Sequence, residues 1–93
     1  MKQSVHFGNL ARTASREVEV ISTLLHDLQR KIELLEADID SEETSRGVRD
    51  VSDPRYPCLA RSLRTRRDNL KATVASLEKR LAAIAAARES IAA

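Results

Sequence analysis

The chain has 93 residues, of which 42% are hydrophobic, 32% are charged and 2% are aromatic, and its formal net charge is +2. This length allows one domain, expected over residues 1–93, without a thick core. Two aromatic residues are too few for the stacking platforms of a typical single-stranded nucleic-acid binder, and no apolar run of about 18 residues is present to span a membrane.

A first helix is predicted over residues 9–45. Gly8-Asn9 supplies a break and an N-cap residue, whose side chain can accept from the first free backbone N–H groups. Apolar and small residues then recur in alternating steps of four and three, the a and d spacing of a left-handed coiled coil. These positions are Phe7, Ala11, Ala14, Val18, Ile21, Leu25, Leu28, Ile32, Leu35 and Ile39.

A loop is predicted over residues 46–56. Gly47 is the residue type that most readily adopts the left-handed conformation closing many helices. Pro54 and Pro57 each lack a backbone N–H, and each pushes the preceding residue out of the helical region. The chain therefore cannot continue as one helix through this segment.

A second helix is predicted over residues 57–92, with Pro57 at its first position, where no donor is needed. The same spacing of four and three returns, with two arginines among the apolar positions. The stripe comprises Ala60, Leu63, Arg67, Leu70, Val74, Leu77, Leu81, Ile84, Arg88 and Ile91.

The two stripes match when residues whose numbers add to 102 are paired. Nine rungs then follow one register, including Ala11 with Ile91, Leu25 with Leu77 and Ala14 with Arg88. Each a residue meets a d residue, as antiparallel helices require. Because the predicted arms are also equal in length, the sequence predicts an all-α fold of two long helices in an antiparallel coiled-coil hairpin.

Charge is divided unequally between the two arms. Residues 9–45 carry four bases and nine acids, and residues 57–93 carry eight bases and three acids, giving −5 and +5. The helices should therefore attract each other. The register places Glu36 near Arg64 and Asp38 near Arg66, and exposed pairs of this kind contribute about 0.2–1 kcal/mol each, enough to bias orientation.

The loop end is a candidate recognition surface because its charges oppose the helix macrodipoles. Acids end the first helix and arginines begin the second, at a cost of about 0.3–1 kcal/mol each. Two explanations stay open: pairing between the helices, or a tip that binds a partner. The candidate partner-binding residues are Arg49, Arg55, Tyr56, Asp40 and Glu43.

Apolar residues outside the stripes indicate a further contact. Large side chains lie off the seam of the first helix, and alanines coat the end of the second. Small side chains let another helix approach closely, so we expect a homodimer that forms a four-helix bundle. The candidate self-association residues are Val20, Leu24, Leu34, Ala83 and Ala87.

The residues that usually carry chemistry are sparse. His6 and His26 lack zinc-ligand spacing to other ligands, no catalytic set can be assembled, and no catalytic, metal-binding or cofactor-binding residue is expected. The lone Cys58 cannot form an internal disulfide, and a small residue tucked beside the loop is favoured over a reactive thiol. With no signal peptide expected, a cytoplasmic location is predicted.

Function is therefore predicted at the level of a class. We expect a non-enzymatic protein–protein interaction module: an adaptor, chaperone or assembly subunit. The two-helix outline around Pro54-Arg-Tyr-Pro57 is similar to the hairpins of type III secretion needle subunits and their small chaperones. One alternative is a transcription regulator that inserts an acidic tip into RNA polymerase, as coiled-coil transcript-cleavage factors do, although these 93 residues are not expected to form the second globular domain of those factors. Another, less favoured, is a nucleic-acid binder acting through the arginines that begin the second helix.

Overall fold

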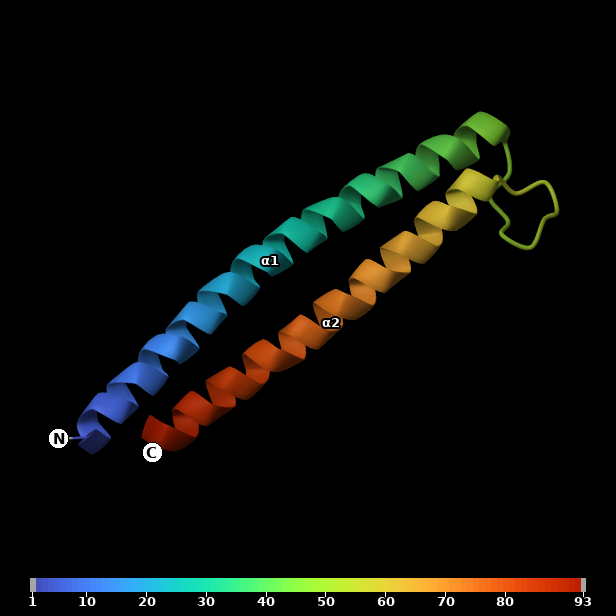
Figure 1. Cartoon of the computed structure of the whole chain (residues 1–93). Coiled ribbons are helices and arrows are strands. Elements are labelled where there is room, and N and C mark those ends of the chain that lie inside the picture. Colours follow the sequence, from blue (N-terminus) through green and yellow to red (C-terminus); the bar gives the residue numbers. More distant parts are fainter. Residues whose placement is uncertain (1, 93) are drawn as a thin grey trace.

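The computed structural model describes the backbone of residues 2–92 and the side chains of residues 12–90. It contains two helices, α1 (Lys2–Arg46) and α2 (Cys58–Ala92). They lie side by side and are joined by a loop at one end, with both chain ends at the other (Figure 1). The predicted all-α hairpin is confirmed, and the described residues form no strand.

The hairpin is a thin rod. It measures 68 × 18 × 16 Å, and its radius of gyration is 20.3 Å, whereas a compact chain of this length would have about 12 Å. Its accessible surface is 7208 Å², against about 5,400 Å² for a typical monomer of this mass. Much of the chain therefore stays in contact with water.

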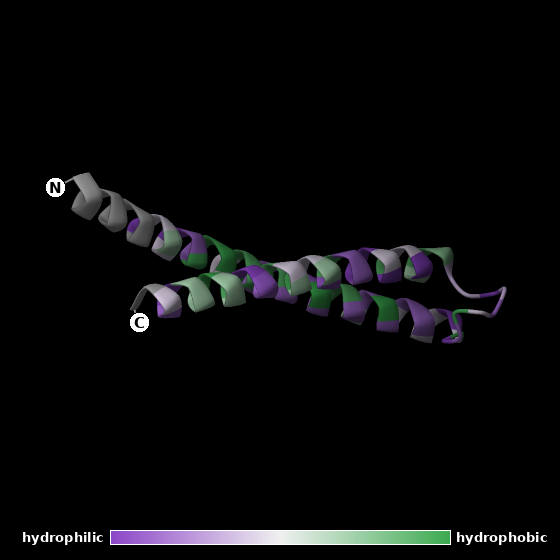
Figure 2. Cartoon of the chain, turned by 90° about the horizontal axis from the view of Figure 1, so that it is seen from below, coloured by the Kyte–Doolittle hydropathy of each residue, from purple (hydrophilic) through white to green (hydrophobic). Residues whose placement is uncertain are grey.

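The predicted seam forms the core. Every described seam position of α1 from Ala14 to Ile39, and of α2 from Ala60 to Ile84, is buried or half-buried. Arg88 is exposed instead, and the rung of Ala11 with Ile91 lies outside the described side chains. Figure 2 shows apolar segments along both helices, including the stretch where the two ribbons overlap in this view. The most buried members of the main cluster are Ile21, Leu25, Leu28, Val74 and Ile84.

Ion pairs between the helices agree with the predicted register. With Ile21 and Leu77 taken as d positions of the heptad, the e positions of the two helices lie opposite one another, and so do the g positions. Each ion pair joins two e positions or two g positions in this way. Their residue numbers add to 97 or 107, on either side of 102. The pairs are Glu17–Arg80 at 2.6 Å, Glu36–Lys71 at 3.3 Å and Glu43–Arg64 at 3.1 Å.

Both ion pairs predicted at the loop end were wrong in detail. Glu36 pairs with Lys71 instead of Arg64, and no ion pair joins Asp38 to Arg66 among the described contacts. Arg64 is instead held by Glu43 and by the Tyr56 hydroxyl, which leaves Lys71, the next e position along α2, to pair with Glu36.

Two predicted helix boundaries also need correction. The first helix begins at Lys2 and runs through Gly8 and Asn9, because an interior glycine costs only about 1 kcal/mol relative to alanine. The arms are consequently unequal, with 45 and 35 residues. The second helix begins at Cys58, and the carbonyl of Pro57 accepts from the Arg61 N–H at 3.1 Å, which makes Pro57 the N-cap.

Candidate functional site

The C-terminus of α1 closes in the way that the sequence predicted. Gly47 has a φ of 71°, and its N–H donates to the carbonyls of Glu43 at 2.9 Å and Thr44 at 3.3 Å. The N–H of Val48 also donates to the Glu43 carbonyl, at 3.3 Å. This is a Schellman motif, which satisfies carbonyls that the end of a helix would otherwise leave free.

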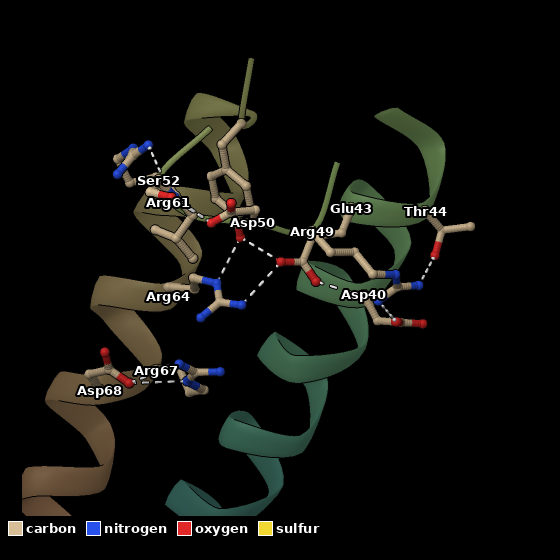
Figure 3. A network of polar contacts seen from close by, with 12 residues as sticks. Asp40, Glu43, Thr44, Arg49, Asp50, Ser52, Arg61, Arg64, Arg67 and Asp68 are labelled. Carbon is tan, nitrogen blue, oxygen red and sulfur yellow. Dashed lines mark hydrogen bonds and ion pairs between the residues drawn. The ribbon is translucent and has the colours of Figure 1, made fainter. Parts of the chain in front are cut away.

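The side chain of Glu43 clamps the two helices together at the tip. Its Oε2 accepts from the Tyr56 hydroxyl at 2.8 Å and from Arg64 Nη2 at 3.1 Å, and the same hydroxyl accepts from Arg64 Nε at 2.7 Å. Figure 3 shows Arg64 reaching across from α2 to Glu43 on α1. The hydrogen bond from Tyr56, followed by that from Arg64, lowers the pKa of Glu43 below its usual 4.5.

A second, small apolar cluster lies under this clamp. Val48, Tyr56 and Ala60 are buried against one another, and Val51 packs on them. The Tyr56 ring also has the guanidinium carbons of Arg61 and Arg64 at 5.4 and 5.7 Å from its centroid, within the range of cation–π attraction. Sequence analysis missed this cluster, although valines placed within a short polar loop were a signal for it.

Two acidic residues order the exposed part of the loop. Asp50 accepts from the backbone N–H and the hydroxyl of Ser52, and Asp53 accepts from the backbone and guanidinium of Arg55. These bonds lower the pKa of both carboxyl groups, with the side-chain hydrogen bond as the largest cause in each case. Short side chains that bond their own backbone two residues on are typical of turns, so the loop has a defined shape.

The predicted tip residues divide into two groups. Three have exposed side chains, with 61% of Arg49, 80% of Arg55 and 68% of Asp40 accessible. Tyr56 and Glu43 are instead buried, at 4% and 5%, which makes them structural parts of the tip and leaves them out of its contact surface. Arg49 contacts both groups, because it pairs with buried Glu43 at 3.6 Å. It also reaches back over α1 to Asp40 at 2.9 Å and to Thr44 at 2.8 Å (Figure 3).

Three of the acids that oppose the dipole of α1 have nearby cations. Asp40 pairs with Arg49, and Glu42 pairs with Arg46 at 3.3 Å. Glu43 has both Arg64 and Arg49, the latter at 3.6 Å. Local pairing therefore offsets part of the unfavourable dipole interaction, and the loop contributes one of the arginines.

The candidate self-association residues gather on one side of the hairpin. The side that bears the Glu17–Arg80 pair is formed by g positions and the neighbouring c positions of both helices; we call it the apolar face. The opposite side bears the Glu36–Lys71 and Glu43–Arg64 pairs. Four large exposed apolar residues occupy g and c positions: Val20 (60% accessible), Leu24 (41%), Leu34 (58%) and Leu59 (56%).

The alanines of this set complete the face at the open end of the hairpin. Ala83 and Ala87 of α2 line a shallow hollow together with Thr13 and Glu17 of α1. The two helices thus contribute to one continuous surface there. The structure brings together all five self-association candidates on this face.

Other candidate features have a simpler description. Cys58 is exposed in the first turn of α2, so its expected packing beside the loop was wrong. Over the described residues, no group of three His, Cys, Asp or Glu side chains is arranged to hold a metal ion. Neither helix, as far as it is described, is long and apolar enough to cross a membrane. No protein-family model, curated protein or solved structure matches the chain.

Proposed function

We propose that this protein is a non-enzymatic protein–protein interaction module that self-associates and presents its loop tip to a protein partner. One observation carries the first part: four large apolar side chains on one face are 41–60% accessible in the single chain. Large apolar side chains exposed on one face are a common mark of an interaction site. A homodimeric four-helix bundle would bury this face.

The self-association is tested by the mass in solution. Light scattering at several concentrations should give twice the chain mass of 10.4 kDa. Leu34→Lys, on the apolar face, should shift the protein toward monomer, whereas Gln29→Lys adds the same charge at an exposed position on the other side and should not. A wild-type mass of 10.4 kDa at every concentration would refute self-association.

The second part of the proposal rests on the exposed charges of an ordered tip. Arg49, Arg55 and Asp40 are displayed on a loop whose turns are fixed by side-chain hydrogen bonds, so a partner would lose little freedom in docking there. Arg49→Ser with Arg55→Ser should abolish partner capture from native cells and preserve the fold.

The control for the tip experiment removes the same charge elsewhere. Arg12→Ser with Arg30→Ser alters two exposed arginines outside the loop and should leave capture intact. Tyr56 is unsuitable for this test because it is buried. If the Arg49 and Arg55 double variant retains every wild-type partner, recognition by the tip is wrong.

The two alternative functions receive less support. An acidic tip that enters a polymerase would need free carboxylates, yet Asp40 and Glu43 both have Arg49 beside them. A phosphate-binding α2 would use the arginines that begin it, yet Arg61 donates to the Val51 carbonyl and Arg64 holds Glu43. Arg67 pairs with Asp68, so Arg66 is the one member of this group without a described hydrogen bond or ion pair. A cytoplasmic location is part of our proposal, since a single unpaired cysteine fits a reducing compartment.

A further inference from the structure

We infer that the partner on the apolar face is a second copy of this chain, related by a two-fold axis along the hairpin, so that both tips lie at the same end. This inference rests on the proposed self-association and adds its geometry. In this arrangement α1 of each copy lies over α2 of the other at the same height along the rod. Residues that meet across the dimer then follow the same register, with numbers that add to about 102.

The two helices contribute different side chains to the apolar face. On α1 the face carries the larger residues Val20, Leu24 and Leu34, which stand out into solvent. On α2, beyond Leu59 and two arginines, it carries small or short polar residues. These are Ser62, Asn69, Thr73, Ser76, Ala83 and Ala87.

Large and short side chains alternate between the helices in the way that this dimer requires. At equal heights Val20 falls opposite Ala83 of the second copy, and Leu34 falls opposite Asn69. Leu24 likewise falls opposite Ser76. A large side chain that enters a space left by a short one is the basis of close packing between helices, and here each such contact occurs twice by symmetry.

Charge favours the same arrangement. Asp38 and Arg66 both lie on the apolar face, are exposed and have no ion pair within the described part of their own chain. With the tips together, Asp38 of one copy comes level with Arg66 of the other. The dimer would thus contain two equivalent ion pairs at the loop end.

The opposite arrangement, with tips at opposite ends, fits less well. It would lay α1 on α1 of the second copy in opposite directions. If Val20 of one copy packs on Leu34 of the other, the two-fold axis passes at residue 27, and Asp27 would face Asp27 of the second copy. Like charges placed opposite each other are unfavourable. Leu24 would also lie against Lys31 in place of a short side chain.

The surface available is sufficient for a stable dimer. The accessible surface of 7208 Å² exceeds the value for a typical monomer of this mass by about 1,800 Å². A standard protein–protein interface needs about 800 Å² per partner. An interface of that standard size would therefore remove less than the excess.

The native cysteine provides a direct test. Cys58 is the only cysteine of the chain, is exposed and lies beside the tip, so a nitroxide label on it gives one label per chain. Pulsed dipolar spectroscopy should find labels closer than about 35 Å in the tip-together dimer, where helix axes are about 10 Å apart. The tip-to-tail dimer places them about 50 Å apart, from the rise of about 1.5 Å per residue.

Each outcome decides a different point. A short distance supports the inference, and a distance near 50 Å would overturn it and leave self-association intact. No dipolar coupling together with a monomer mass would remove the proposed self-association as well. As a second measurement, Asp38→Arg should weaken dimerisation about tenfold, and added Arg66→Asp should restore it; failure of this rescue would count against the tip-together arrangement.

Discussion

The Tyr56 hydroxyl donates a hydrogen bond to Glu43 Oε2 over 2.8 Å, and through it the start of α2 is held against the end of α1. The Glu43 carbonyl also accepts two of the three backbone bonds that close α1. One residue therefore ends the first helix and anchors the second. The tip owes its shape to this coupling between the backbone cap and the buried polar side chains.

We expect Tyr56→Phe to destabilise the hairpin by about 1–2 kcal/mol. The variant keeps the ring in the small apolar cluster but removes a donor to Glu43 and an acceptor for Arg64, and a lost buried hydrogen bond has about this cost. Urea denaturation at neutral pH measures the change. Arg55→Ala, which removes only an exposed loop contact, is the control and should shift the midpoint far less.

Acid should weaken the fold through Glu43. The pKa of Glu43 lies below 4.5 in the folded chain. Its contribution is therefore present above pH 4.5 and lost as the pH falls through the folded value. Glu43→Gln should flatten the pH dependence of unfolding free energy between about pH 5 and pH 2. Tyr56→Phe should flatten it partly, because it removes the largest cause of the shift. An unchanged slope in Glu43→Gln would contradict this assignment.

Gly47→Ala should destabilise the hairpin by about 1–2 kcal/mol, the cost of a left-handed conformation for a residue with a Cβ. The φ of 71° is the cause, since an added Cβ would meet nothing within 4 Å. Gly47→Asn is the matched variant and should cost less, because asparagine visits this region more readily. Equal losses for the two variants would indicate that the cost has another origin.

Truncation of the seam and of the apolar face should have different effects. Leu25→Ala should lower the free energy of unfolding by about 2–4 kcal/mol, since Leu25 is buried in the main cluster. Leu77→Ala, its partner across the seam, should have a similar effect. Leu34→Ala, at an exposed position, should mainly raise the dissociation constant. Thermal melts at low concentration and light scattering separate the two effects. A melting temperature as low for Leu34→Ala as for Leu25→Ala would contradict the assignment of Leu25 to the seam and of Leu34 to the apolar face.

The seam could be predicted because it depends on a repeat. Residues such as Ile21, Leu25 and Val74 recur at a spacing that only a helix can place on one side, and two matched stripes imply an antiparallel pair. Gly47 could be predicted because a positive φ selects for glycine. Gly8 could not be interpreted correctly in this way, because a glycine lowers helix stability without preventing a helix.

The tip could not be predicted because no periodic pattern governs it. Whether Tyr56 is displayed or buried depends on the path of the loop, which brings it beside Val48 and Ala60. Glu36 pairs with Lys71 because Arg64 is engaged by Glu43 and Tyr56 at the tip, and heptad positions alone do not reveal that engagement. The sequence therefore predicted one contact surface from all the tip residues, although some of them are exposed and available to a partner and others are buried and hold the tip together.

We expect the Glu36–Lys71 pair to stabilise the hairpin. Glu36→Lys and Lys71→Glu should each destabilise the hairpin by about 0.2–1 kcal/mol, because each places like charges together at an exposed position. The double reversal should restore most of the loss. Glu36→Lys combined with Arg64→Glu should not, since Glu43 would then face an acid in place of its cation.

Urea denaturation of the single and double variants completes a double-mutant cycle for Glu36 and Lys71. A coupling free energy clearly different from zero is expected for this pair, because neighbouring residues fail to behave additively. Additive losses for Glu36 and Lys71, together with rescue of Glu36→Lys by Arg64→Glu, would show that the helices meet as heptad positions alone suggested. In that case the contact of Glu43 with Arg64 would not decide which charges pair across this hairpin.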